Sequence, residues 1–315
     1  MRIWISLFRA VVIIFSVGVL IFLLMRALPV DPLATLAGGK SANPELIAEL
    51  RAQFGLDQPL FAQLGDWLFK LLQGDFGISI QTRQNVLTMI GNYLPITLQL
   101  LLGSLIVIFL ISVPLGVWAG ANQGGRLDQL LSSLSMLFGV VPIFFSGILV
   151  IQLFGTTLNW LPTFGEGEPG WDRVVHLLLP CLLLGLQAGS SLTRMVRSSV
   201  AEAMDQSYIR LAAAKGAGRL RIVWVHAFRA SWMTIVSITA MNAGYLLVQA
   251  VLVEYTFGIS GFGSIMIKAA QESDYNVVQA CALVVSAVFV AANTLADWLH
   301  PWIDPRLGER EENEL

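Results

Sequence analysis

Long apolar blocks separated by polar stretches dominate the residue pattern of this chain. The blocks cover approximately residues 8–28, 94–119, 131–154, 177–195, 233–254 and 277–299. An α-helix rises about 1.5 Å per residue, so about 20 apolar residues are enough to cross the hydrocarbon layer of a bilayer. The pattern therefore predicts an all-α polytopic membrane protein with six transmembrane helices.

The first apolar block has the composition of a secretory signal, with Arg2 and Arg9 ahead of an apolar run from Ala10 to Met25. A small-x-small cleavage site does not follow this run, so we expect a retained first span that starts on the inner side. Residues 1–29 then form the N-terminus and the first span.

Residues 30–93 are polar by the standard of this chain and about as long as a small domain. Asn43-Pro44 predicts a helix start, with an N-cap followed by Pro at the first helical position, and Gly55 predicts the end of that helix. An amphipathic segment, Leu60–Leu72, follows, and Gly74-Asp75-Phe76-Gly77 predicts a turn. We therefore expect an external insertion between the first two spans.

Small residues and proline in the core, residues 94–300, predict how its spans pack. Gly116-x-x-x-Gly120 and Gly185-x-x-x-Gly189 each offer a face on which another helix can approach closely. Pro142, in the third block, frees a backbone carbonyl that lipid cannot satisfy, so a neighbouring helix or a cavity has to bond it. We expect a kink there that faces the interior of the bundle. Residues 301–315 form a charged tail.

Composition supports the assignment as a membrane protein, and the distribution of charge predicts how the chain is oriented in the membrane. Hydrophobic residues make up 56% of the 315 positions and charged residues 13%, which is more apolar surface than one soluble core can bury. Twelve of the 19 Lys and Arg fall in segments that six spans place on one side, and such residues concentrate in the cytoplasm. Both termini are therefore expected in the cytoplasm. The densest basic segment is the loop of residues 196–232, and the net charge of −2 gives no indication of nucleic-acid binding.

A short amphipathic helix is predicted inside this basic loop, over Tyr208–Lys215. Ile209, Ala212 and Ala213 fall on one face of it, and Gly216 can end it. Such a helix would offer a docking surface for another protein. On composition alone, a basic loop that serves only membrane topology fits equally well.

Three short motifs stand in this loop. They are Tyr208-Ile209-Arg210, the run Ala212-Ala213-Ala214-Lys215-Gly216, and His226-x-x-Arg229. Together they resemble the coupling-loop signature of ABC importer permeases, in the variant of the dipeptide, oligopeptide and nickel importer family, first-permease (B-type) subunit. In that family the loop holds a coupling helix that sits in a cleft of a separate ATPase subunit. Departures from the usual family pattern are Leu211, Ala230 and Thr234.

Motifs outside the loop resemble the same family. In the external region they are Gly55-Leu56-Asp57-Gln58-Pro59-Leu60 and Gly74-Asp75-Phe76-Gly77-x-Ser79. In the C-terminal third they are the segment Glu254–Gly263, Asp274-Tyr275-x-Val277-Val278-Gln279, Asn293-x-x-x-Asp297 and Asp304-Pro305-Arg306, with Ser260 in place of the usual Pro. Gly258, Gly261 and Gly263 predict a tight outer turn, and they lack the spacing of a phosphate-binding loop.

The resemblance implies a type I ABC importer permease in a bacterial inner membrane, with a periplasmic insertion between its first two helices. It implies that the chain forms one half of a pathway that works by alternating access. The implied partners are a homologous second permease, two cytoplasmic ATPase subunits, a periplasmic solute-binding protein and membrane lipid, with no nucleic acid. The implied solutes are peptides, nickel, metal chelates or glutathione-like compounds. ATP and Mg²⁺ would be bound by the ATPase subunits, so we expect no cofactor and no metal in this chain.

Polar residues inside the spans are candidates for lining the pathway. They are Gln152, Gln187, Asn242 and Gln249, with Glu254 at the outer end of the fifth span and Gln99 and Ser190 as further members. As an alternative, each forms a hydrogen bond between helices, worth on the order of 1 kcal/mol. Asn293 and Asp297 share a helix face near the inner end of the sixth span, where capping or pairing with an Arg is the simpler role.

Sequence motifs for catalysis are missing. Gly38-Gly39-Lys40-Ser41 imitates the end of an ATP-binding loop, but Ala34 stands where that loop needs glycine. The three histidines are far apart in sequence, and neither G-x-S-x-G nor a paired Cys motif occurs. We therefore expect a transport subunit that is not an enzyme. The alternative is an ion-coupled secondary carrier or channel without an ATPase, which would need a buried charge pair or discontinuous helices at mid-membrane.

Overall fold

The computed structural model describes residues 2–27, 33, 44–53 and 55–303. Within these ranges the chain is helical apart from its turns and an isolated antiparallel bridge between Ile78 and Asn85. The predicted all-α fold class is thereby confirmed.

Some of the predictions lie outside the described residues. They are the N-cap Asn43, the ATP-loop imitation Gly38–Ser41, the side chain of Asp297, and the motif Asp304–Arg306. The described chain divides into two compact units. They are Met1–Thr97 with Ser260–Val290, and Leu98–Ile259 with Ala291–Leu315.

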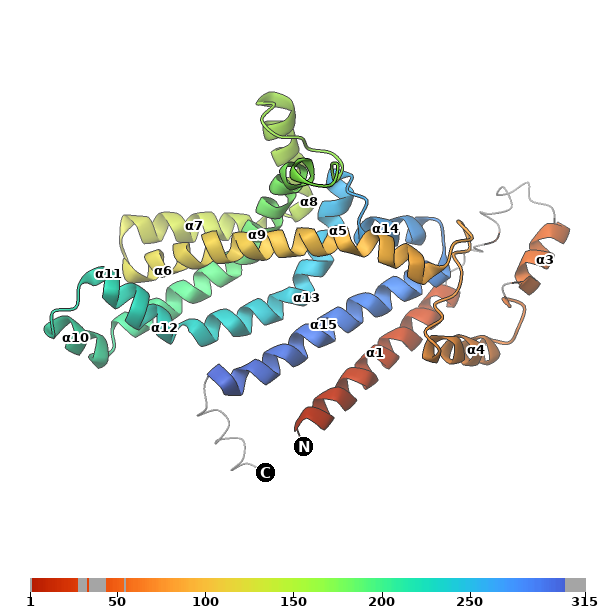
Figure 1. The fold of residues 1–315 in the computed structure, drawn as a ribbon, viewed down its shortest axis with the longest axis horizontal. Helices are drawn as coiled ribbons and strands as arrows, with labels where there is room; N and C mark the ends of the chain where they lie inside the picture. The colour runs from red at the N-terminus through yellow and green to blue at the C-terminus, as the bar shows by residue number, and fades with distance from the viewer. Residues whose placement is uncertain (1, 28–32, 34–43, 54, 304–315) are drawn as a thin grey trace. The chain divides into compact units, whose positions relative to one another are not determined.

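The first unit combines the N-terminal helices with helices from the C-terminal third (Figure 1). Its elements are α1 (Arg2–Ala27), α3 (Pro44–Gln53), α4 (Leu60–Leu72), α14 (Phe262–Gln271), and parts of α5 (Val86–Val107) and α15 (Tyr275–Ile303). α3 ends as predicted, because Gly55 has φ +66° and Leu56 N–H donates to Arg51 O (2.9 Å). The bounds of α4 are those predicted from its amphipathic pattern. The core of the unit brings Ile80, Phe262 and Tyr275 together.

A buried carboxylate joins the turn at Ser79 to the start of α15 in this unit. Asp274 is 2% exposed, accepts the Ser79 hydroxyl, and accepts the backbone N–H groups of Ile80 (3.2 Å) and Gln81 (3.3 Å). Asn276 adds a bond from its Nδ2 to the Ile78 carbonyl (2.8 Å). A buried carboxylate needs several donors to offset the loss of water. The Ser79 turn is therefore held to the sixth predicted span.

The second unit is arranged around α9 (Trp171–Met204). The other helices are α6 (Val113–Ala121), α7 (Arg126–Val140), α8 (Ile143–Val150), α10 (Ser207–Ala214), α11 (Arg219–Arg221), α12 (Phe228–Ala230) and α13 (Trp232–Phe257). Three π-helical segments are η2 (Ile108–Ser112), η3 (Ile151–Thr157) and η4 (Ile222–Ala227). α6, α7, α8 and α13 all contact α9, and Figure 1 shows α6 and α7 running alongside it.

Glycines let α9 approach its neighbours at backbone distance. A Cβ added to Gly116 of α6 would lie 2.7 Å from the Thr193 carbonyl oxygen of α9. On α9 itself, a Cβ at Gly185 would lie 2.8 Å from the Ser104 carbonyl oxygen of α5. Both distances are shorter than a methyl group tolerates. The predicted close contacts at the two glycine pairs are confirmed.

Two of the expected helix shapes differ from the structure. The fourth span was expected to end at Met195, but α9 has 34 residues and continues to Met204. Its last four residues, Ala201, Glu202, Ala203 and Met204, are strong helix formers, and they favour a helix that continues beyond the apolar block. The kink expected at Pro142 is a full break, since the axes before and after it differ by 106°.

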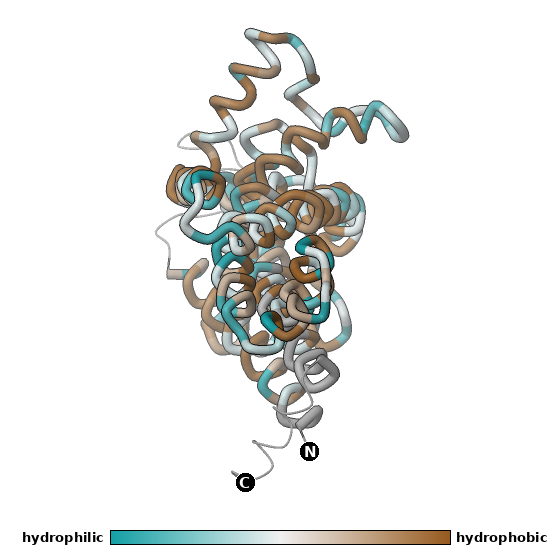
Figure 2. The backbone as a smooth tube through the Cα atoms, turned by 90° about the vertical axis from the view of Figure 1, so that its left-hand side faces the viewer, coloured by the Kyte–Doolittle hydropathy of each residue, from teal (hydrophilic) through white to brown (hydrophobic). Residues whose placement is uncertain are grey.

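The number of helices that could cross a membrane is four to six in the described part of the chain, and its upper value agrees with the six predicted spans. Four helices of the described part are long and apolar enough to cross a bilayer: Ser6–Ala27, Val86–Ala121, Trp171–Met204 and Tyr275–Leu295. Two bent pairs, α7 with α8 and η3, and α13 with α14, bring the count to six if each pair is one span. Figure 2 shows hydrophobic residues, in brown, along most of the helical backbone.

The glycine contacts give a first prediction. Gly120→Leu should lower the free energy of unfolding by about 1–3 kcal/mol, because overpacking forces α6 away from α9. Gly91→Leu is the matched control, since nothing lies within 4 Å of a Cβ at that helical position. Denaturant unfolding of the detergent-purified protein measures both variants. Equal stability of the two would contradict the close contact.

Candidate functional site

The helix predicted in the basic loop is α10, which ends at a left-handed glycine. Gly216 has φ +85°, its N–H donates to Ala213 O (2.9 Å), and Ala217 N–H donates to Ala212 O (3.1 Å). These two bonds form a Schellman motif, which satisfies carbonyls at the helix end and favours glycine. The predicted helix and its stop are confirmed. Its docking role stays a prediction.

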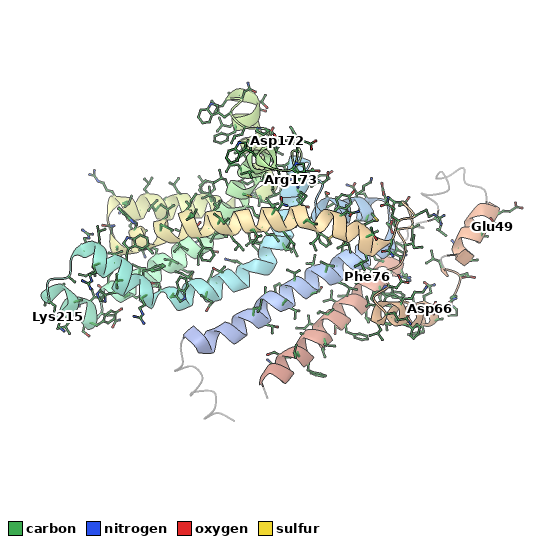
Figure 3. All side chains as sticks on the ribbon, in the orientation of Figure 1. Glu49, Asp66, Phe76, Asp172, Arg173 and Lys215 are labelled. Carbon is green, nitrogen blue, oxygen red and sulfur yellow. The ribbon has the colours of Figure 1, made fainter. Side chains whose placement is uncertain are left out.

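α10 buries one apolar side chain and leaves most of the others accessible. Ile209 is 4% exposed, and Ala212 is half-buried. The exposed residues are Tyr208, Arg210, Leu211, Ala213, Ala214, Lys215 and Gly216. Ala213, which the sequence placed on the same face as Ile209, is thus exposed. Figure 3 shows Lys215 at the far end of this loop.

The other two motif residues of the loop lie in the return segment formed by α11, η4 and α12. His226 is half-buried in η4, and Arg229 is exposed in α12. Ile222, Val223 and Ala227 bury the inward side of the segment. η4 contacts both α10 and α9, so the return segment lies between the exposed helix and the long central helix.

Further contacts tie the return segment at both ends. Arg219 Nη2 donates to Asn122 Oδ1 (2.7 Å), in the turn between α6 and α7. At the other end, Trp224, Phe228 and Trp232 form a ladder with ring centroids 5.7 Å and 5.9 Å apart. Such aromatic pairs stabilise a contact beyond their buried area. The return segment is therefore attached to the α6–α7 turn at one end and to α13 at the other.

An ion pair that sequence reasoning missed braces the end of α9 that leads to α10. Arg197 Nε donates to Asp128 Oδ1 (2.9 Å) and Arg197 Nη2 to Asp128 Oδ2 (2.6 Å). Asp128 is 3% exposed and also accepts Gly124 N–H (2.9 Å) and the Ser132 hydroxyl (3.2 Å). The two partners are 69 positions apart, so no local pattern reveals the pair. The signal that the sequence did contain was Asp128 itself, an acidic residue in the first turn of an otherwise largely apolar helix.

The pathway candidate Gln187 bonds the broken helix. Its Nε2 on α9 donates to the carbonyl of Val141, next to Pro142. A backbone carbonyl at a break inside lipid needs such a partner. The neighbouring helix α9 therefore bonds one carbonyl at the break, that of Val141. The carbonyl that Pro142 itself frees belongs to Phe138, four residues earlier, and for it the expectation stays a prediction.

Other pathway candidates have different environments. Asn242 Nδ2 on α13 donates to Ser191 Oγ on α9 (3.3 Å), and Gln249 Nε2 donates to Tyr245 OH (2.7 Å) within α13. Gln152 is exposed in η3. The bonds of Gln187 and Asn242 are of the interhelical kind given as the alternative, and a role in the pathway stays a prediction. Of the further members, Gln99 is exposed and Ser190 is buried.

The predicted outer turn closes α13. Gly258 has φ +62°, and Ile259 N–H donates to Glu254 O (2.9 Å), so glycine again supplies a left-handed helix end. The side chain of Glu254 is fully buried. Gly261 is extended at the start of α14, and Gly263 is buried in its first turn.

Comparison with known proteins agrees with these features. The family model described as "Binding-protein-dependent transport system inner membrane component" matches residues 112–309, and its N-terminal companion matches residues 3–101. A putative peptide transport system permease protein of Brucella suis is 36% identical over 304 residues, covering 95% of this chain and 96% of the relative. The dipeptide transport system permease protein DppB of Escherichia coli K12 is 31% identical over 322 residues, covering 94% and 95%.

A solved structure shares the fold. It is the inward-facing MetNI methionine ABC transporter, with a TM-score of 0.56, 15% identity, and coverage of 69% of this chain and 97% of that chain. Fold and matches define a multi-pass, all-helical membrane protein of the importer permease class. The chain belongs to the family of binding-protein-dependent transport system inner membrane components. It is the permease subunit of an ABC importer, and a transport subunit rather than an enzyme.

The Asp128–Arg197 pair gives a second prediction. A double-mutant cycle with Asp128→Ala, Arg197→Ala and the double variant should yield a coupling energy of about 1–3 kcal/mol, because both bonds are charge-assisted and one partner is buried. Denaturant unfolding in detergent measures the cycle. Additive effects of the two single variants would show that the pair does not brace α9.

Proposed function

We propose that this permease forms half of the translocation pathway for peptides and that α10 is the helix through which partner ATPase subunits drive it. The named relatives transport peptides or dipeptides, which favours this class over the nickel, metal-chelate and glutathione-like solutes that the resemblance left open. The observation that carries the proposal is the exposed, glycine-terminated α10 on a braced loop. The chain belongs to the binding-protein-dependent transport family, and this membership gives no support to the alternative function, an ion-coupled secondary carrier or channel.

The bracing of the loop supports a mechanical role for α10. η4 packs between α10 and α9, Arg219 bonds Asn122, and Arg197 bonds Asp128. A displacement of α10 is therefore passed to α9 and the α6–α7 turn instead of being absorbed by a loose loop. To move the helices from 1:99 to 99:1 between two arrangements, the ATPases must favour one of them by about 5.5 kcal/mol.

The remaining parts of the proposal concern partners. A second, homologous permease completes the pathway, two cytoplasmic ATPases bind ATP and Mg²⁺, and a periplasmic binding protein delivers the solute. No cofactor or metal is assigned to this chain. Both termini lie in the cytoplasm and residues 30–93 lie outside, as the Lys and Arg distribution indicates.

Gly216 tests the coupling role. Gly216→Val forces a β-branched residue to φ +85°, which costs at least about 1–2 kcal/mol and should unwind the end of α10. We expect ATP-dependent uptake of a labelled dipeptide into proteoliposomes and retention of the ATPases during purification to fall together, with membrane insertion unchanged.

Gly218→Val is the matched control for this experiment. Gly218 lies in the same loop with φ −65°, and nothing lies within 4 Å of a Cβ at either position. Valine is therefore unstrained there. Normal uptake by the Gly216 variant would refute the coupling role.

Membrane orientation is testable by reporter fusion. A reporter joined after Arg306 should give a cytoplasmic signal, because six spans return the chain to the side on which it starts. A fusion after Gly74, in the external insertion, should give the opposite signal. A periplasmic signal after Arg306 would overturn the orientation.

A further inference from the structure

The amphipathic helix α4 lies against the side of α1 in the first unit. The ring centroids of Trp67 and Phe22 are 5.5 Å apart, and a Cβ at Gly18 would lie 3.1 Å from Trp67 Cη2. Arg26 Nε donates to Gln63 Oε1 (2.8 Å). Gln63 and Trp67 are one turn apart, so these contacts fix one side of α4 on α1.

The residues of α1 that contact Trp67 of α4 lie one to three turns before the C-terminal end of α1. Phe22 and Gly18 lie five and nine residues before Ala27, the last residue of α1. At about 1.5 Å per residue, these positions are roughly 7 and 13 Å from that end. Ser6–Ala27 is a candidate span that is largely unburied within the structure. Trp67 therefore lies at the level of the hydrocarbon layer, beside the outer half of the first span in the orientation proposed above.

α4 carries an apolar edge on the side that α1 does not cover. Phe61 is 84% exposed, Leu72 is 87% exposed, and Phe69 is exposed as well. On a helix of 3.6 residues per turn these three residues occupy one side. Gln63, Asp66 and Lys70 occupy the other side, where they line a polar cavity of about 620 Å³. Figure 3 labels Asp66 on this helix.

We propose that the edge formed by Phe61, Phe69 and Leu72 is seated among the lipid acyl chains of the outer leaflet, so that α4 anchors the insertion between the first two spans in the membrane. Lipid fits this edge because Trp67 packs against Phe22 and Gly18 at the depth of the hydrocarbon layer, and the candidate span α1 itself presents exposed apolar residues, Leu20, Leu23 and Leu24, at that depth. Apolar side chains on one face and charges on the other are the pattern of helices that lie in a bilayer interface.

Spin labelling tests this anchor in the complete importer. Cys181 and Cys281 are replaced by Ala, single Cys residues are introduced by Phe61→Cys, Leu72→Cys and Asp66→Cys, and Leu24→Cys on α1 is the lipid reference. The complex is reconstituted in vesicles of phosphatidylethanolamine and phosphatidylglycerol. The measurement is the accessibility of each nitroxide to oxygen, which partitions into lipid, and to a water-soluble nickel chelate.

We expect labels at 61 and 72 to match the lipid reference and the label at 66 to respond to the nickel chelate. If 61 and 72 respond to the chelate as 66 does, the edge faces water and the proposal is wrong. If both reagents are excluded at 61 and 72, another protein covers the edge, which overturns the proposal equally.

Maleimide reactivity gives a second, independent readout. In the complex, Phe69→Cys should react with a water-soluble maleimide about tenfold or more slowly than Asp66→Cys, because apolar surroundings disfavour the reactive thiolate. When the protein is unfolded in denaturant, the two cysteines should react at similar rates, because neither is then surrounded by lipid. Equal rates in the folded complex would contradict a lipid-seated edge.

Discussion

Close backbone contact along α9 is the constraint on which the second unit depends. Lipid is as apolar as the helix surfaces, so helices inside a bilayer gain little from hiding apolar side chains from one another. Gly116 and Gly185 remove the side chains that would hold the backbones apart, and van der Waals contact then operates along the helix length. α9 can therefore serve as a common support for α6, α7, α8 and α13.

At the end of α9 that leads to α10, polar contacts are added to the glycine packing, which continues there because a Cβ at Gly120 would lie 2.5 Å from the Arg197 carbonyl oxygen. The Arg197–Asp128 pair and the Arg219–Asn122 bond connect α9 and the return segment to the α6–α7 turn. Charge-assisted bonds are directional, so they fix the orientation of the loop as well as its distance. The same chain of contacts that stabilises the fold therefore leads from the exposed surface of α10 to the membrane helices.

Neutral amides give the membrane region a different kind of contact. Gln187 bonds the carbonyl left at the break before Pro142, and Asn242 bonds Ser191 across α13 and α9. A neutral hydrogen bond inside lipid contributes on the order of 1 kcal/mol, far less than the cost of separating a buried charge pair. Helices joined in this way are held together less firmly than helices joined by a buried charge pair.

The helices could be predicted from the residue pattern, because the signals for them are local. Apolar length predicted the spans, the amphipathic pattern placed α4 at Leu60–Leu72, and the need for positive φ identified Gly55 and Gly216 as helix ends. Tertiary structure alone decided which distant polar groups meet, as in Asp128 with Arg197 and Asp274 with Ser79, and how deep α4 lies beside α1. A helix pattern depends on neighbours three or four positions away, whereas the partner of a buried charge depends on how segments tens of residues apart pack.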